Sequence, residues 1–306
     1  MRKILKQLSL SDITTQVFLL FLTAVNIIFA GSISSWYIFI PVNIVIIVLI
    51  TVIVLAYKEN SNKLLKVIRF WYPMAMIIFI FKEVYHIIFA LHSSDWDPML
   101  IKIDHFIFGL NPTEWIFRFQ NSYLTEFLQI IYFLYYFVII IYGLELYLWG
   151  RYKEFLYAVF VLLTGFYFSY IIYMLIPAAG PRFYLHNFIN TDSELPGIFV
   201  TKYIRQFLNF AESIPAGVSV DAVKYVQRDA FPSAHTEIVV LIAYLSHKIK
   251  SKSFYFYLPY CILMIISTLY LRYHYAIDVI AGVAAAIITI IFANKIYKKL
   301  MIKPLI

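Results

Sequence analysis

The sequence predicts an all-α fold, a polytopic transmembrane helical bundle of about eight spans with the N- and C-termini in the cytoplasm. Hydrophobic residues make up 62% of the chain and charged residues only 14%, which is far more apolar than a soluble globular domain. The apolar residues also gather in runs of about 20, the length at which a helix crosses a bilayer. A membrane protein without a separate soluble domain is therefore expected.

The predicted spans are bounded by polar and turn-forming residues. Ser9, Ser11 and Asp12 precede the first apolar run, and the Gly31–Ser35 break ends it. Gly150 and Arg151 close the fourth run. The eight predicted spans cover about residues 15–31, 36–57, 67–91, 126–149, 155–176, 234–245, 254–271 and 275–292.

Two longer polar regions separate some of these spans. Residues 92–125 carry several aspartates, and Asn111 before Pro112 is typical of a helix start. We expect this loop to hold short interfacial helices. Residues 177–232 contain turn signals at Pro177, Gly180–Pro181, Pro196–Gly197 and Pro215. A polar stretch of this length with many aromatic residues predicts a folded, functional loop.

The distribution of basic residues predicts the orientation. The net charge is +8, and the lysines and arginines cluster in short loops at 58–69, 151–153, 248–252 and 295–303. The positive-inside rule places these loops, with the basic Met1–Lys6 start as a retained anchor, in the cytoplasm. Residues 177–232 and 271–275 then share the extracytoplasmic face. The basic residues form no stripe, so no nucleic acid partner is expected. The single Cys261 excludes an intrachain disulfide.

Four side chains capable of phosphate chemistry fall on this face: Arg182, His235, His274 and Asp278. His274 and Asp278 lie four residues apart, on one helix face, where the carboxylate orients the imidazole. His235 starts a helix after Ser233, and the free N–H groups there favour an anion. Arg182 supplies a planar cation for phosphate oxygens. These groups predict a phosphoryl-transfer site that uses no metal and no cofactor.

Three sequence motifs resemble those of the type 2 phosphatidic acid phosphatase superfamily. Residues 231–236 (FPSAHT) are similar to its Pro-Ser-Gly-His motif, and residues 270–282 (YLRYHYAIDVIAG) to its His-x-x-x-Asp motif. Residues 177–182 (PAAGPR) resemble the first motif of the inositol phosphorylceramide synthase and inositolphosphotransferase branch. The resemblance covers about residues 155–292, with a weaker likeness at 104–115.

The resemblance implies a fold and a set of roles. The fold would have N-terminal spans and an interfacial loop in residues 1–125 and a six-helix catalytic core in residues 126–306, together one integrated membrane domain. His274 would attack phosphorus to form a phosphohistidine, with Asp278 orienting it and His235 protonating the leaving group. Arg182 and Ser233 would hold the phosphate. The partners would be a lipid phosphate substrate and a lipid or water acceptor, at the extracytoplasmic face of the cell's inner membrane.

Departures from the phosphatase motifs bear on the substrate. Ala234 replaces a glycine, Leu175 stands where a lysine is expected, and Thr268 stands where an arginine is expected. Arg272 is a candidate replacement phosphate ligand. A site with fewer cations fits a phosphodiester with one negative charge better than a monoester with nearly two. This favours transfer of a phospho-headgroup between lipids.

Other interpretations stay open at this point. The enzyme alternative is a phosphatase acting on lipid phosphate monoesters, of the phosphatidic acid or polyprenyl pyrophosphate type, with Arg228 or Lys82 restoring the missing charge. Arg228 and Asp229 are candidate headgroup ligands, and a solvated loop pair is the competing interpretation. A lipid transporter is disfavoured, because its polar groups would lie near the membrane midplane in repeated halves.

Overall fold

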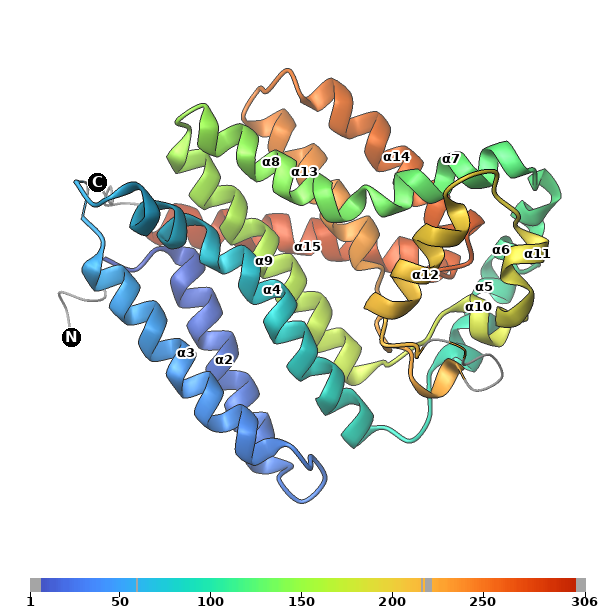
Figure 1. Ribbon diagram of the computed structural model, residues 1–306, viewed down its shortest axis with the longest axis horizontal. Helices are drawn as coiled ribbons and strands as arrows, with labels where there is room; N and C mark the ends of the chain where they lie inside the picture. The colour runs from blue at the N-terminus through green and yellow to red at the C-terminus, as the bar shows by residue number, and fades with distance from the viewer. Residues whose placement is uncertain (1–6, 59, 216, 218–221, 301–306) are drawn as a thin grey trace. The chain divides into compact units, whose positions relative to one another are not determined.

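The computed structural model describes residues 7–58, 60–215, 217 and 222–300, and within these ranges it is helical, with no β-strand (Figure 1). The predicted all-α class is therefore confirmed. Both chain ends, including the predicted anchor Met1–Lys6 and Lys303, lie outside the described residues. The described chain divides into two compact units, one built from residues of 1–93, 143–170 and 288–306 and the other from 94–142 and 171–287. The division into 1–125 and 126–306 stays a prediction.

Helices at all eight predicted spans are present, although they differ in length. Five are long and apolar enough to cross a membrane, and a sixth candidate is α7 followed by α8, which are bent by 47° relative to each other. The five are α2 (Leu10–Ile28), α3 (Trp36–Ala56), α4 (Lys63–Leu91), α9 (Tyr152–Leu175) and α15 (Ala276–Leu300). The remaining two, α13 (Ala234–Lys248) and α14 (Phe254–Tyr270), have 15 and 17 residues.

The short α13 is enclosed by protein on most sides. Its buried residues include Thr236, Glu237 and Ser246 as well as Ile238 and Leu241. A helix surrounded by other helices needs no continuous lipid-facing stripe, because its polar groups find partners inside the protein. This explains why its sequence is less apolar than that of the other spans.

In the first unit, α2 begins five residues earlier than its apolar run predicts. Ser9 caps the helix, and Asp12 at the third helical position accepts from the Ser9 N–H at 2.7 Å. Asp12 also binds the guanidinium of Arg69 at 2.9 and 2.6 Å and accepts from the Tyr72 hydroxyl. The polar residues that precede the apolar run thus belong to the helix, because a partner on α4 neutralises Asp12.

A buried polar cluster joins three helices of the same unit. Glu83 of α4 accepts hydrogen bonds at one carboxylate oxygen from Asn26 of α2 at 2.7 Å and from Asn43 of α3 at 2.9 Å. All three side chains are fully buried. An ionisable group inside a membrane helix is costly unless it is paired. The two amides are therefore what allows Glu83 to be buried here.

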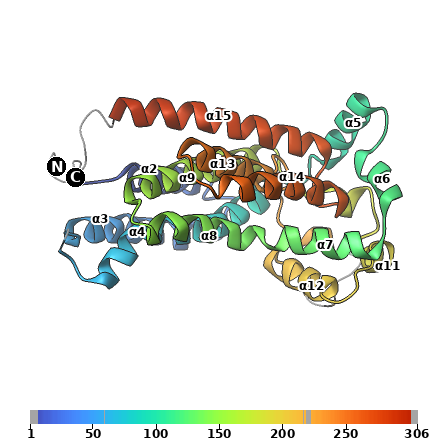
Figure 2. The same ribbon diagram turned by 90° about the horizontal axis from the view of Figure 1, so that it is seen from above.

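The second unit contains nearly all of the two long polar regions and all three sequence motifs described above. Asn111 precedes α6 as predicted, and α12 lies beside α7 in both views (Figures 1 and 2). The helices of this unit not yet described are α5 (Asp97–Phe108), α6 (Pro112–Ile116), η1 (Phe117–Phe119), α7 (Ser122–Phe133), the start of α8 (Tyr135–Leu148), α10 (Pro181–Tyr184), η2 (Phe188–Asn190), α11 (Thr191–Glu194), α12 (Thr201–Ala211) and η3 (Ala222–Lys224).

Replacing Asn43 by Leu removes one of the two donors to the Glu83 carboxylate. We expect the protein to lose about 1–2 kcal/mol of stability, the cost of leaving a buried acceptor underbonded in a membrane helix. Thermal unfolding of the detergent-solubilised protein measures this loss. In a Glu83→Leu background the same substitution should cost much less. An equal loss in both backgrounds would contradict the assigned pairing.

Candidate active site

His274 lies in the short connection between α14 and α15, and its two ring nitrogens face different partners. Nδ1 lies 2.9 Å from the carbonyl oxygen of Ala230, and Nε2 lies 3.2 Å from Nδ1 of His235. A carbonyl oxygen only accepts hydrogen bonds, so Nδ1 of His274 carries the proton. The lone pair of Nε2 therefore points at His235, which donates from its own Nδ1. The two predicted histidines do meet.

Aromatic rings form a wall beside the histidine pair. The His235 ring packs against Tyr132 of α7 at 4.8 Å and Tyr135 of α8 at 4.4 Å between centroids. Tyr132 in turn stacks on Tyr273 at 4.2 Å. These contacts pack the imidazole of His235 against the rings of α7 and α8. The bend between α7 and α8 brings both tyrosines to the same point.

Asp278 lies close to His274 without making the shortest contact to it. Its Oδ2 is 3.5 Å from His274 Nδ1 and accepts from the Tyr275 N–H at 2.8 Å. The distance to the imidazole exceeds that of a hydrogen bond, whereas the carbonyl of Ala230 supplies the direct one. The orienting role of Asp278 therefore stays a prediction.

The loop that carries His274 is fixed by the end of α14. The N–H groups of Tyr273 and His274 donate to the carbonyl of Thr268 at 3.0 and 3.2 Å. Arg272 adopts a left-handed conformation with φ +65°, where glycine is usual at a helix end. A side chain there costs about 1 kcal/mol. The Arg272 side chain forms an ion pair with Glu194 and lies 4.7 Å from the centre of the Phe117 ring.

The first motif packs directly on this loop. Gly180 has φ +102°, and a Cβ there would lie 2.7 Å from the carbonyl oxygen of Tyr273. Only glycine permits this approach. Two residues later, the N–H of Arg182 donates to the carbonyl of Arg272 at 3.2 Å. Residues about ninety positions apart are thus joined through their backbones.

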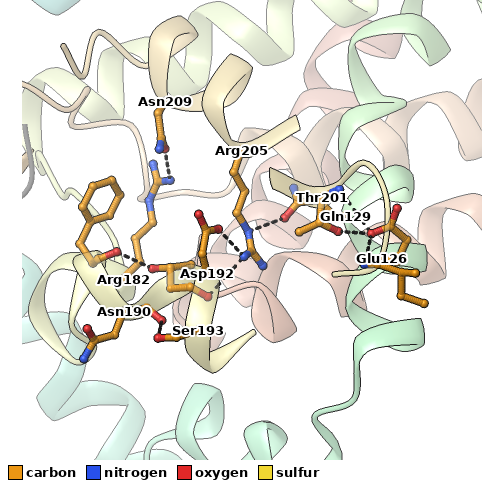
Figure 3. Close-up of polar contacts among 12 residues, drawn as sticks. Glu126, Gln129, Arg182, Asn190, Asp192, Ser193, Thr201, Arg205 and Asn209 are labelled. Carbon is orange, nitrogen blue, oxygen red and sulfur yellow. Dashed lines mark hydrogen bonds and ion pairs between the residues drawn. The ribbon is translucent and has the colours of Figure 1, made fainter. Parts of the chain in front are cut away.

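The guanidinium of Arg182 is buried and already has partners. It donates to Asn209 of α12 at 3.3 Å (Figure 3). It also forms an ion pair with Glu212 and lies 4.7 Å from the centre of the Tyr273 ring. The same Tyr273 ring stacks on Tyr132 beside His235. Arg182 is therefore at the aromatic wall of the histidine pair, held by the end of α12.

Ser233 joins the second and third motifs. Its side chain caps α13 by accepting from the Thr236 N–H at 3.2 Å, and its own N–H donates to the carbonyl of Asp278 at 3.0 Å. A Cβ at Gly282 would lie 2.5 Å from the Ser233 carbonyl oxygen. Glycine at 282 thus allows α15 to approach the start of α13.

The remaining predicted ligands differ in their surroundings. Arg228 donates to Asp95 at 3.0 Å and to the Val226 carbonyl at 2.7 Å. The negative charge of Asp229 raises the pKa of His274. The pKa of His274 is lowered to about 4: burial is the main cause, Asp229 and the bond to Ala230 oppose it, and the charge of Arg182 adds a smaller lowering. His274 is accordingly neutral at neutral pH, the form a nucleophile requires.

Two aspartates of α5 are site residues that the sequence analysis assigned only to a polar loop. Asp97 accepts from the N–H groups of Ala179 and Gly180 at 2.8 and 2.7 Å and from the Tyr275 hydroxyl at 2.8 Å. Asp104 accepts from the first two N–H groups of α15 at 2.8 and 2.7 Å. Burial raises the pKa of both carboxyls, and these hydrogen bonds oppose the rise. Their seven-residue spacing, two helical turns, was the available signal.

A second network ties α12 to α7 (Figure 3). Glu126 accepts from the N–H groups of Ile198 and Val200 at 2.8 and 2.6 Å and from the Thr201 hydroxyl at 2.6 Å. Arg205 of α12 donates to Gln129 at 3.1 Å and forms an ion pair with Asp192 at 2.8 Å. Sequence reasoning did not find these contacts, because no motif marks them.

In the described part of the chain, no group of three His, Cys, Asp or Glu side chains could hold a metal ion. A family model for the PAP2 superfamily matches residues 99–292, well over half of the chain and all three motifs. The chain belongs to the PAP2 superfamily. No curated protein and no solved structure matches the chain.

Membership of the PAP2 superfamily indicates the general class of the protein. PAP2 superfamily members are generally phosphatases or phosphotransferases, so this chain is assigned as an enzyme of that kind. Its long apolar helices indicate an integral membrane protein. The match does not separate the branches of the superfamily, and the relation to inositol phosphorylceramide synthase stays a prediction.

The electrostatic influence of Asp229 on His274 is testable by titration. Because the Asp229 carboxylate stabilises the imidazolium, Asp229→Asn should lower the pKa of His274 below that of the unaltered protein. Nuclear magnetic resonance of carbon-13-labelled histidine rings in micelles measures this. Asp192→Asn, which alters a carboxylate paired with Arg205, serves as the matched control. A pKa that stays the same or rises in Asp229→Asn would contradict the proximity of the two groups.

Proposed function

We propose that the protein is a membrane phosphoryl-transfer enzyme that moves a phospho-headgroup between lipids through a phosphohistidine on His274, without a metal. The observation that carries this proposal is the paired arrangement of His274 and His235, with Nε2 of His274 unprotonated and Nδ1 bound to Ala230. This tautomer is the one that attacks phosphorus. The active site would face the extracytoplasmic side, as the loop charges favour.

The first step forms a bond between nitrogen and phosphorus. Nε2 of His274 gives its lone pair to the phosphorus atom while the bond to the leaving oxygen breaks. His235, protonated in the complex with the anionic substrate, gives a proton to that oxygen. The Ala230 carbonyl and Asp278 stabilise the positive charge that develops on the imidazole of His274.

The second step reverses the first with a new oxygen. The acceptor hydroxyl, from a lipid or from water, gives its proton to the now neutral His235 and attacks phosphorus. The bond between nitrogen and phosphorus breaks, and its electron pair returns to His274. Both histidines recover their starting states.

The short distance between the two histidines implies that His235 moves when substrate binds. The two histidine nitrogens lie 3.2 Å apart, which leaves no room for a phosphorus atom and an in-line leaving oxygen. The rings must separate when substrate binds. Because Tyr132 and Tyr135 pack against His235, the bend between α7 and α8 is the part of the chain that accommodates this movement.

The pairing of the arginines favours a phosphodiester over a monoester. Arg182 is paired with Glu212, Arg228 with Asp95 and Arg272 with Glu194. The predicted phosphate ligands Arg182 and Arg272 and the predicted headgroup ligand Arg228 thus each have their own carboxylate, and the negative charge of Asp229 raises the pKa of His274. A substrate with nearly two negative charges finds less compensation here than one with a single charge. This supports headgroup transfer, with Arg228 and Asp229 as ligands of the headgroup.

His274→Ala should reduce turnover of lipid phosphates to background, because the attacking nitrogen is lost. His235→Ala should slow formation of the phosphoenzyme and slow its breakdown even more. With substrates that have good leaving groups, the phosphoenzyme should therefore accumulate. The enzyme is incubated with labelled lipid phosphate in a buffer that contains EDTA, and alkaline gel electrophoresis then detects the labelled phosphoenzyme. Full turnover by His274→Ala would reject the phosphohistidine.

Headgroup transfer is distinguished from hydrolysis by the fate of the phosphate. The purified enzyme is incubated with phosphatidylinositol plus a ceramide or diacylglycerol acceptor and, separately, with phosphatidic acid. We expect a new headgroup-bearing lipid whose formation requires the acceptor. Release of inorganic phosphate from phosphatidic acid without any transfer product would assign the enzyme as a lipid phosphatase and reject transfer.

A further inference from the structure

The helix α12 has an unusual distribution of side chains. Its inward face buries Thr201, Arg205 and Leu208, and Arg205 makes polar contacts there. Its outward face is aromatic: Tyr203 is 70% exposed and Phe210 79% exposed. A helix of a water-soluble surface has the opposite arrangement. Something other than water is therefore expected to cover this face.

The exposed side of α12 divides into two strips. Tyr203, Phe207 and Phe210 follow the i, i+4, i+7 spacing of one helix face, and Phe207 is 50% exposed. Lys202 and Gln206 are also exposed, and the helical repeat places them on the neighbouring strip. An aromatic strip beside a polar strip is the pattern of a helix that lies along a boundary between water and lipid.

The aromatic strip continues onto a membrane helix. The Phe207 ring lies 5.6 Å from Phe133 of α7 and 6.3 Å from Tyr136 of α8. These two helices form a candidate span, and Phe137, one residue further, is 45% exposed. The exposed aromatic rings of α7 and α8 thus continue through Phe207 onto α12, and α12 lies beside α7 in Figures 1 and 2. This continuity identifies lipid as the covering.

The polar contacts of α12 hold it in place independently of the aromatic strip. Glu126 binds the start of the helix, and Gln129 binds Arg205 in its middle (Figure 3). At its other end Asn209 and Glu212 hold the guanidinium of Arg182. One side of α12 therefore faces lipid while its end positions a predicted phosphate ligand.

We propose that α12 is an interfacial helix whose strip of Tyr203, Phe207 and Phe210 inserts among the acyl chains of the bilayer next to the active site. The inserted strip brings lipid substrates to the active site, while Asn209 and Glu212 hold Arg182 in place. The insertion itself follows from the surface alone, and its effect on catalysis rests on the proposed function. The acyl chains of phospholipids would cover the three aromatic side chains of the strip.

Nitroxide labels test the insertion without any activity measurement. Single cysteines replace Tyr203, Phe207, Phe210, Lys202 and Gln206 in a Cys261→Ala background, and the labelled proteins are placed in liposomes of phosphatidylcholine and phosphatidylglycerol. Labels at the three aromatic positions should collide more with oxygen than with a water-soluble nickel chelate. Labels at Lys202 and Gln206 should show the reverse order.

Two outcomes would overturn the insertion. Water-type accessibility at all five positions would place the strip in solvent. Dipolar broadening between labels on different molecules would show that a second copy, and not lipid, covers the strip. Since all five side chains are exposed, the labels are expected to leave folding intact, and thermal unfolding of each variant checks this.

The catalytic consequence has its own test. Phe207→Ser and Phe210→Ser should raise KM for a lipid substrate in vesicles by about tenfold, as expected for the loss of a buried aromatic side chain. A water-soluble short-chain substrate with the same headgroup should be turned over at the original rate. Gln206→Ser is the matched control and should change neither. Equal losses on both substrates would reject the role in lipid access. Inactivity of the unaltered enzyme would reject the proposed function and leave the label result standing.

Discussion

The candidate site depends on how two buried carboxylates of α5 satisfy backbone N–H groups. The start of α15 and the loop at Ala179 and Gly180 both expose N–H donors inside the protein, where unpaired donors are costly. Asp104 accepts the first and Asp97 the second, and Asp97 also binds the hydroxyl of Tyr275. His274 immediately precedes Tyr275. Its position is therefore a consequence of these hydrogen bonds as much as of the helices around it.

Much of the fold was predictable because lipid imposes a simple requirement on sequence. Runs of apolar residues mark the spans, and the structure has helices at all eight. The start of α2 was predicted wrongly because Asp12 is compensated by Arg69, a residue far away in the chain. The short α13 also departs from the apolar pattern, because protein and not lipid surrounds most of it. Departures from the pattern thus arise where partners distant in sequence replace the solvent.

The meeting of His235 and His274 was predictable from their motifs, whereas their hydrogen-bond partners were not. The acceptor for Nδ1 of His274 is the carbonyl of Ala230. Every residue type has a backbone carbonyl, so the sequence does not indicate this partner. The carboxylate partners of Arg182 and Arg272 lie in the long loop after α9, where no periodicity assigns positions. The left-handed backbone of Arg272 is similarly hidden, because glycine and not arginine is the usual signal for it.

The ion pair between Arg182 and Glu212 also bears on how the enzyme finishes a cycle. In the proposed function Arg182 binds an anionic ligand, and Glu212 is adjacent to replace that ligand when it departs. Binding and release then become exchanges of one anion for another, each with a small change in net charge. Under the proposed function, a site of this kind would retain an anionic lipid product weakly. Slow product release, a common limit on turnover, would then be relieved by a residue that takes no part in the chemistry.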